Sequence, residues 1–453
     1  MARSSPRVAL GIIVSITAVV AFAPVGCRGG KPPEGGPGAA AVGGGGAGKT
    51  LRVVRNLGGR QGFIAHWDAW KAAFERDNPG WTMELIDLGN ADGAEYYKAR
   101  AATGDMPEVI QTWALTDYLA DNGIIVPLPD DYYSRHGIPT PLPYKGKFYA
   151  SQGGLQLVGI AVNKDQWDSA GVKGPPMTWD ELVSDLAALK AAGVRPLVYG
   201  GKEWSAAMPL TELLQIELYD YIVDPDKPSW NTLRDEGKTS FATDPVVRKA
   251  VGQAVYLVDN FVEKGALSDG YNEEQRDFYS GSGATWIMGC WIGGDLEANK
   301  VQFSVEYWPI PSMTGKEPKF ISNTGGQSGW AITTTATGEK YDKAVAVLDA
   351  FYDPEVYQLY LNGEAMLNNR EGSTVTGPKT DWAPAQRFFD QMAANYKTFG
   401  GAAGSWRSCG DKWPAGMEMS VARAMQEIIS GQRDIDKLMK MLDDDWDNAR
   451  KGE

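Results

Sequence analysis

Few residues of this chain have the types and spacing that catalysis or metal binding requires. The two histidines are His66 and His136, and neither has a partner at the spacing of metal ligands. The serine-nucleophile motif G-x-S-x-G and the zinc motif H-E-x-x-H do not occur. We therefore expect no catalytic residue, no metal ion and no cofactor. Carboxylates are plentiful, so a glycosidase pair stays open as an alternative.

One stretch matches the phosphate-loop pattern G-x-x-x-x-G-K-[ST], from Gly43 to Thr50. A working loop of this kind follows a strand and opens a helix, whose first amides bind the phosphates. Here the match follows a glycine-rich segment and leads into a predicted strand. We interpret it as a chance product of glycine richness, without nucleotide binding.

Aromatic residues offer a different chemistry. The chain has 16 Trp, 19 Tyr and 13 Phe, and several of them fall in predicted loops. A carbohydrate needs flat apolar faces for the C–H surfaces of its rings and polar side chains for its hydroxyls. Because most aromatic side chains in any protein pack in the core, their position in the fold must decide which of them could bind a ligand.

The N-terminal segment predicts the compartment. Arg3 and Arg7 precede a mostly apolar run that ends at Cys27, which is the pattern of a lipoprotein signal. We expect residues 1–26 to be the signal peptide and Cys27 to be acylated, which makes the protein an extracytoplasmic, membrane-anchored lipoprotein. Residues 28–49 are almost entirely Gly, Ala and Pro, and with Cys27 they predict a flexible tether over 27–49.

The net charge limits the kinds of molecule that the protein can bind, and the cysteine count limits its possible disulfides. The formal net charge of −13 argues against binding to nucleic acid, which is itself polyanionic. Apart from Cys27 the chain has two cysteines, Cys290 and Cys409. In an oxidising compartment they could form a disulfide, and the alternative is two buried thiols.

From residue 50 onward, short apolar strands alternate with amphipathic helices, which predicts an α/β fold with a mostly parallel sheet covered on both faces. Strands are expected at 51–54, 83–86 and 108–112. Ligands of such sheets bind beyond the carboxyl ends of the strands, which here means loops 55–62 and 112–117.

Several motifs in order along the chain resemble one family. They are G-K-F-Y at 146–149, V-N-K-D at 162–165, P-P-M-T-W-D-E-L at 175–182, G-G-K-E-W at 200–204, and the run from Phe278 to Trp291. The chain resembles the family 1 extracellular solute-binding proteins, the sugar receptors of ABC importers, of the maltose-binding-protein type. The resemblance covers most of the chain.

The resemblance implies a two-lobed periplasmic-binding-protein fold, in which the chain crosses between the lobes more than once. The expected N-terminal lobe comprises 50–154 and 305–350, and the expected C-terminal lobe comprises 155–304 and 351–453. Such a protein would be a monomer that binds a mono- or oligosaccharide between its lobes and delivers it to the permease. The alternatives are a carbohydrate-active surface enzyme and a receptor of the same fold for a non-sugar polyol or polyamine.

The resemblance also implies ligand-contacting residues at the matching positions. Trp113 and Asp117 follow a strand of the first lobe, and Glu203 with Trp204 is the acidic and aromatic pair of the second lobe. Trp291 stands where the family has a stacking tryptophan. The remaining expected contacts lie in the crossing segments and in the late loop, and they are Gln156, Gly326, Gln327 and Trp406. Trp413 is the other tryptophan near the late loop.

Overall fold

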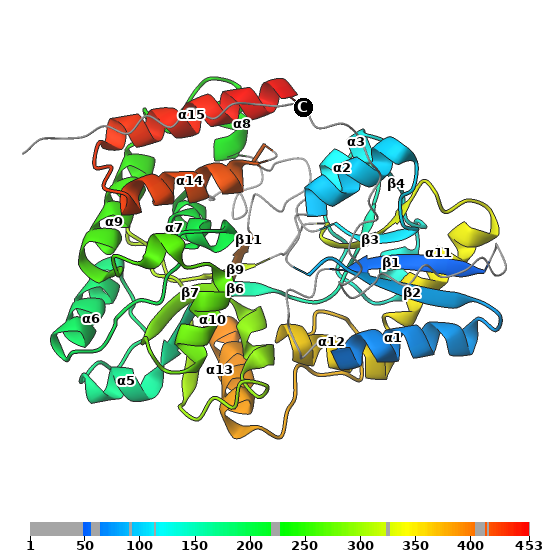
Figure 1. Ribbon diagram of the computed structural model, residues 1–453, viewed down its shortest axis with the longest axis horizontal. Coiled ribbons are helices and arrows are strands. Elements are labelled where there is room, and N and C mark those ends of the chain that lie inside the picture. The colour runs from blue at the N-terminus through cyan, green and yellow to red at the C-terminus, as the bar shows by residue number, and fades with distance from the viewer. Residues whose placement is uncertain are drawn as a thin grey trace, which may run out of the picture. The chain divides into compact units, whose positions relative to one another are not determined.

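The computed structural model describes residues 49–55, 64–89, 93–112, 115–218, 227–322, 327–403, 413–414 and 416–452. These residues form two β-sheets, each covered by helices (Figure 1). Within the described residues, none of the helices combines the length and the apolar character that crossing a membrane would require.

The first sheet has the strand order β2-β1-β3-β10-β4, and β5 pairs with β10 as well. Its strands are β1 (Thr50–Arg55), β2 (Thr82–Asp87), β3 (Val109–Gln111), β4 (Ile125–Val126), β5 (Ala150–Gln152) and β10 (Gly329–Thr333). β1 is parallel to β2 and β3, whereas β10 is antiparallel to β3, β4 and β5. The three predicted strands and their parallel order are therefore confirmed.

The residues of β1 alternate between the two faces of this sheet, as the twofold repeat of a strand requires. Leu51 and Val53 pack in the larger core with α1, and Val54 packs in a second cluster with Tyr97 of α2. α1 thus lies below the sheet in Figure 1 and α2 lies above it. The helices associated with this sheet are α1 (Ile64–Asp77), α2 (Gly93–Thr103), α3 (Thr116–Asp121), α4 (Tyr132–Arg135) and α11 (Glu339–Ala350).

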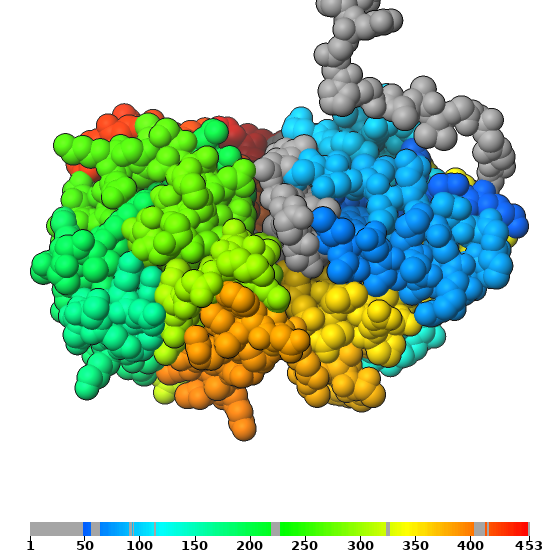
Figure 2. Space-filling view, turned by 60° about the horizontal axis from the view of Figure 1, so that its bottom comes forward, coloured from blue at the N-terminus to red at the C-terminus, as the bar shows by residue number. Residues whose placement is uncertain are grey.

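Helix α1 buries the aromatic face that its sequence predicts. Trp67, Trp70 and Phe74 are all buried, and the Trp70 indole donates a 2.8 Å hydrogen bond to the carbonyl of Val347 in α11. α1 also packs on α12 (Pro354–Glu364). In Figure 2 the blue surface of α1 borders the yellow-orange surface of α12. Through these contacts a late segment of the chain completes the first body.

The second sheet is built around β6 (Leu157–Asn163), all of whose residues are buried. β6 pairs antiparallel with β7 (Thr285–Gly289), β8 (Val305–Trp308) and β9 (Phe320–Ser322), and β11 (Gly401–Ala403) runs parallel to β9. The expectation of a mostly parallel sheet is thus wrong for this sheet, and in the first sheet only the β1–β2 and β1–β3 pairs are parallel. The apolar runs of these strands predict burial, but they carry no information on strand direction.

Helices cover this second sheet and extend to the C-terminus. They are α5 (Lys164–Ser169), α6 (Trp179–Ala191), α7 (Met208–Leu218), α8 (Trp230–Asp235), α9 (Pro245–Phe261), α10 (Tyr271–Tyr279), α13 (Ala383–Phe399), α14 (Met417–Ile429) and α15 (Ile435–Gly452). Short 3₁₀ turns lie at η3 (Trp204–Ala207), η4 (Ala266–Ser268) and η5 (Cys290–Asp295). The capping box of Thr178 and Glu181 at the start of α6 is present, as its sequence predicts.

The path of the chain between the sheets differs from the expected one at its return to the first sheet and at α12, which was expected in the C-terminal lobe. The first change of sheet falls between Gln152 and Leu157, inside the segment where we expected it. The return was expected at residue 305, yet β8 and β9 still pair with β6. The chain therefore returns to the first sheet only between Ser322 and Gly329. α12 then packs on both α1 and η5, so it contacts both bodies.

Candidate functional site

Three aromatic rings from separate parts of the second body come together at the carboxyl end of β7. The ring centroids of Trp204 and Tyr271 are 5.1 Å apart, and those of Trp204 and Trp291 are 6.2 Å apart. The Trp291 indole nitrogen donates a 2.9 Å hydrogen bond to the hydroxyl of Tyr271. We call Trp204, Tyr271 and Trp291 the aromatic group. The structure thus brings two of the predicted ligand residues into one cluster.

Three short elements position the aromatic group, and each places its ring at the first or second residue. Trp204 opens η3, Tyr271 is the first residue of α10, and Trp291 is the second residue of η5, directly after β7. Helix and turn starts of this kind leave a side chain at the edge of an element, where it can reach a neighbouring segment.

Two glycines make room for these side chains. A Cβ at Gly289 would lie 1.8 Å from the Trp291 ring, and a Cβ at Gly270 would lie 2.6 Å from a carboxylate oxygen of Glu203. Both distances are far below van der Waals contact, so a larger residue at either position would displace its neighbour. The glycines therefore fix where the Trp291 ring and the Glu203 carboxylate lie.

The rings differ in how much of their surface is accessible. Trp291 is 8% exposed and Tyr271 is 7% exposed, whereas Trp204 is only partly buried, as is the adjacent Glu203. Trp204 therefore offers the most accessible aromatic face of the group, and the Trp291 ring packs beside it in a tilted orientation. Glu203 supplies acceptor oxygens next to this face, which is the combination that hydroxylated rings require.

A buried acid, Glu274 of α10, lies one helical turn after Tyr271. Its Oε1 accepts a 2.5 Å hydrogen bond from the Gly200 amide, and the residue is 2% exposed. Burial raises the pKa of Glu274 to about 8, and nearby Glu203 adds to the rise. The Gly200 amide, Ser205 and Trp286 act in the opposite direction on this pKa. Glu274 is thus a neutral acid at pH 7.

Sequence reasoning missed both Tyr271 and Glu274. Tyr271 follows a glycine at a helix start, a position that carries no sugar-specific signal. Glu274 stands in a helix with three other charged residues, Glu273, Arg276 and Asp277, and such a pattern normally indicates a solvated face. Only the packing of α10 against residues 200–205 distinguishes Glu274 from its neighbours.

The remaining predicted contacts that the structure describes lie on or near the first sheet. Asp117 is 6% exposed in the first turn of α3, and Gln156 is half-buried between β5 and β6. Gln327 is 1% exposed, and its side-chain amide forms hydrogen bonds with the backbone of the segment 142–149. It accepts from the Tyr149 amide at 2.6 Å and donates to the carbonyls of Leu142 and Lys147. This amide holds a loop in place, so we leave Gln327 out of the proposed ligand set.

Other predicted residues lie outside the described part of the chain, and they are Cys27, Trp113, Gly326, Trp406 and Cys409. Trp413 is described, and it is a core residue that is 3% exposed and packs on Phe241. Cys290 is fully buried, and its Sγ accepts a 3.3 Å hydrogen bond from the Leu157 amide. The disulfide between Cys290 and Cys409 stays a prediction.

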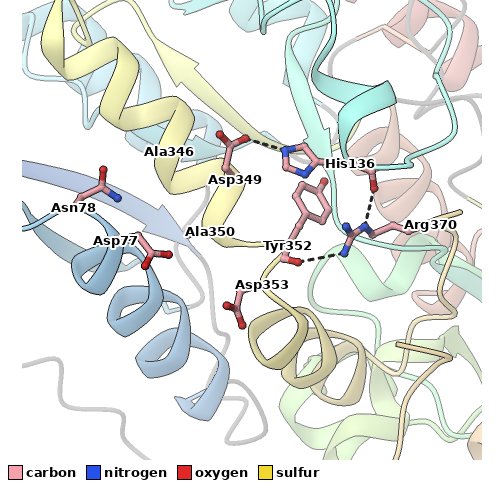
Figure 3. A pocket seen from close by; sticks show the side chains of 9 residues that line it. All are labelled: Asp77, Asn78, His136, Ala346, Asp349, Ala350, Tyr352, Asp353 and Arg370. Atoms are coloured by element: carbon pink, nitrogen blue, oxygen red, sulfur yellow. Dashed lines mark hydrogen bonds and ion pairs between the residues drawn. The ribbon is translucent and has the colours of Figure 1, made fainter. Parts of the chain in front are cut away.

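A pocket of about 430 Å³ lies elsewhere, on the first body (Figure 3). His136 Nε2 is 2.8 Å from Asp349 Oδ1, and Arg370 donates to the carbonyls of His136 and Tyr352. None of the predicted ligand residues lines this pocket. It is lined by Asp77, Asn78, His136, Ala346, Asp349, Ala350, Tyr352, Asp353 and Arg370. Because its polar groups bind one another, we interpret it as a surface hollow between packed elements.

The two histidines lie in different surroundings. His66 is buried, and its pKa lies well below the usual range because of burial and the adjacent Arg55 guanidinium. The partner of His136 is the Asp349 carboxylate. Within the described ranges, no three His, Cys, Asp or Glu side chains are grouped as metal ligands would be.

The comparisons with known proteins agree with this architecture. The model of the bacterial extracellular solute-binding protein family matches residues 61–358. A protein of Brucella melitensis named "Probable sugar-binding periplasmic protein" is 27% identical over 265 residues, which are 52% of this chain and 59% of that protein.

Solved structures show the same fold. A chitin oligosaccharide binding protein superposes with a TM-score of 0.74 at 21% identity, over 90% of this chain and 100% of that one. A sugar transporter protein of Bacillus licheniformis, in complex with stachyose, gives a TM-score of 0.70 at 16% identity, over 88% and 100%. The fold is that of the two-lobed periplasmic binding proteins, and its family consists of receptors rather than enzymes. The chain belongs to the bacterial extracellular solute-binding proteins.

Proposed function

We propose that this protein is the receptor of an ABC importer and that it binds a mono- or oligosaccharide against the aromatic group. The observation that carries this proposal is the cluster of Trp204, Tyr271 and Trp291, with the Glu203 carboxylate packed against Gly270, the residue before Tyr271. The cluster provides a half-buried ring face together with hydrogen-bond acceptors. A sugar ring presents the complementary surfaces, an apolar C–H face and a rim of hydroxyls.

The names of similar proteins support this ligand class. The Brucella melitensis relative is named as a sugar-binding protein, and two of the similar structures are named for a chitin oligosaccharide and for a complex with stachyose. The similarity at 16 to 27% identity does not select one sugar. The ligand class is therefore proposed at the level of a saccharide.

In this proposal the ligand contacts both lobes. Glu203 and Trp204 belong to the body of the second sheet, and Asp117 follows β3 of the first sheet. A saccharide that contacts residues of both bodies stabilises the arrangement in which they approach each other, because its affinity is greater for that arrangement. Trp113, Gly326 and Trp406 complete the proposed ligand set, and the loaded receptor would present the sugar to the permease.

The protein would act as a monomer outside the cytoplasm, held to the membrane by a lipid on Cys27. The evidence for the anchor is the apolar segment before Cys27 and the Gly/Pro-rich stretch after it. A tether of that composition would allow the receptor to turn toward its permease.

A screen of saccharides tests the proposal. The purified protein is heated with maltose, raffinose, stachyose, xylo-oligosaccharides and chitin oligosaccharides in turn, and the unfolding temperature is recorded. A receptor should be stabilised by at least one of them, since a ligand that binds the folded state raises its stability. Chromatography of the same mixtures separates the main alternative, because a receptor returns the sugar intact and an enzyme releases products. No stabilisation by any saccharide, or hydrolysis of one, would contradict the proposal.

A further inference from the structure

A buried carboxyl group connects the two segments that carry the exposed part of the site. Glu274 lies three residues after Tyr271 in α10, and this spacing places both on the same side of the helix. Its Oε1 accepts the amide hydrogen of Gly200, four residues before Trp204. The Cγ of Glu274 would lie 3.1 Å from a Cβ at Gly200, so the two segments are in close contact. One side chain thus joins the Tyr271 helix to the Glu203–Trp204 segment.

The other carboxyl oxygen of Glu274 is buried near two polar side chains, those of Ser205 and Trp286. Within the described residues, Glu274 Oε2, Ser205 Oγ and Trp286 Nε1 do not meet the geometry of a complete hydrogen bond, although Ser205 and Trp286 lie near enough to lower the pKa of Glu274. Ser205 follows Trp204 in η3, and the Trp286 ring lies 5.9 Å from that of Tyr271. Unsatisfied polar atoms in such a place are costly unless a proton or a small movement pairs them.

The charged surroundings favour the neutral form of this acid. The Glu203 carboxylate is the charged group that acts on Glu274, and the buried hydroxyl of Tyr199 is a further titratable neighbour. The adjacent Glu273 is directed to the helix start, where it accepts from the Gly270 amide. Among the described residues no Lys, Arg or His forms an ion pair with Glu274. Ionised Glu274 would therefore add a second negative charge near Glu203 without a cation paired to it.

We propose that Glu274 is a positioning residue of the saccharide site, whose neutral acid form holds the Glu203–Trp204 segment against Tyr271 and whose ionisation weakens binding. The effect on binding rests on the proposed function, because it requires a saccharide ligand. The role of Glu274 in holding the Glu203–Trp204 segment does not depend on any ligand. Loss of the proton adds a second carboxylate charge within electrostatic reach of Glu203. Repulsion between the two charges, and the cost of a buried unpaired charge, would shift the segment that carries Trp204.

The first test uses the protein without ligand. Tryptophan emission is recorded from pH 6 to pH 10 for the wild type and for Glu274→Gln, which imitates the neutral acid. Trp204, Trp286 and Trp291 surround the acid, so the wild type should show an emission change near pH 8 that Glu274→Gln lacks. Identical titration curves for the two proteins would overturn the proposal, whether or not any sugar binds.

The second test measures affinity against pH, with the saccharide of the screen that gives the largest thermal shift. If binding requires the neutral acid and its pKa is about 8, the dissociation constant should rise about tenfold from pH 7 to pH 9. Glu274→Gln should bind at both pH values as the wild type does at pH 7. Glu274→Ala, which loses the bond to Gly200, should bind more weakly at every pH.

The outcomes of the two tests separate the two claims. If no saccharide binds but the emission change is present in the wild type alone, the proposed function fails and the positioning role stands. If a saccharide binds with the same dependence on pH in the wild type and in Glu274→Gln, the proposed function stands and the positioning role fails.

Discussion

At the scale of single residues, the proposed site divides its roles between two tryptophans. Trp204 is partly accessible and offers a face to a ligand, whereas Trp291 is 8% exposed and donates its indole hydrogen to Tyr271. Both residues are predicted from the sequence as ligand contacts. Burial distinguishes them, because a ring that is enclosed on most sides supports its neighbours more than it contacts a ligand.

Trp204→Ala should weaken saccharide binding without unfolding the protein. Removing the accessible ring face should cost roughly 1 to 2 kcal/mol, which is about 5- to 30-fold in affinity. Isothermal calorimetry with the best saccharide of the screen measures the effect. Tyr256→Ala is the matched control, since Tyr256 is a 43% exposed aromatic residue of α9 outside the aromatic group. Equal affinities for Trp204→Ala and the control would contradict the assignment of the site.

At the scale of elements, the junction of β7 and η5 depends on Gly289, which has no side chain and so leaves room for the Trp291 ring. Gly289→Ala should push the Trp291 ring out of its place and break its bond to Tyr271, because the new Cβ would lie 1.8 Å from that ring. Overpacking of this kind typically costs about 1 to 3 kcal/mol of stability. Thermal unfolding and near-ultraviolet circular dichroism measure both effects.

Gly252→Ala serves as the control for that substitution. Gly252 lies within α9, and a Cβ there would meet Ile435 at an ordinary distance of 3.7 Å. Alanine within a helix is favoured over glycine by roughly 0.5 to 1 kcal/mol, so this variant should be as stable as the wild type or more stable. The account of the β7–η5 junction would be wrong if Gly289→Ala behaved like Gly252→Ala.

The contact of α10 with residues 200–205 predicts a dependence of stability on pH. The pKa of Glu274 is raised from 4.5 to about 8 in the folded protein, so the folded state retains a proton that the unfolded state has lost over this range. Stability therefore falls as pH rises from about 5 to 8, by at most about 1.4 kcal/mol per pH unit. Glu274→Gln has no such proton to lose.

The wild type and Glu274→Gln should consequently unfold at similar temperatures at pH 5, and the variant should become the more stable of the two toward pH 8. Because all other titrating groups are common to both proteins, the difference between them isolates Glu274. A constant difference in unfolding temperature over this range would show that the folded protein does not hold Glu274 in its neutral form.

Local patterns predicted the elements well, and long-range pairing could not be predicted. The Thr178–Glu181 capping box and the buried face of α1 follow from spacing within one helix, and the structure confirms both. Strands β8 and β9 have four and three residues, which is too short for a pattern that selects a partner. Their pairing with β6 depends on residues far away in the chain. The same limit explains why Glu274 was missed, since its burial is produced by the segment 200–205.

At the scale of the whole molecule, the proposed anchor predicts a covalent change at Cys27. Acylation follows from the signal pattern before this residue and the Gly/Pro-rich stretch after it. Protein extracted from membranes of the native host should begin at Cys27 and carry lipid there, as mass spectrometry of its N-terminal peptide can show. A Cys27→Ser variant should lose the modification. An N-terminus at another residue, without lipid, would contradict the anchor.

The course of the chain suits a receptor whose two bodies move. The chain passes from the first sheet to the second between Gln152 and Leu157, and it returns between Ser322 and Gly329. Connections of this kind are segments at which one part of a fold can rotate against another. A ligand held between the proposed contacts of both bodies would favour the closed arrangement.

Small-angle X-ray scattering tests this central claim most directly, because a receptor that closes on its saccharide must become more compact. The radius of gyration is measured for the purified protein with and without a saturating concentration of the best saccharide, and again for Trp204→Ala at the same sugar concentration. The account predicts that the radius of gyration of the wild type falls when the sugar is bound. At the same sugar concentration the weaker-binding variant is not saturated, so its radius should fall less or not at all. An identical radius for the free and loaded wild type, with binding verified by calorimetry, would contradict closure around a sugar.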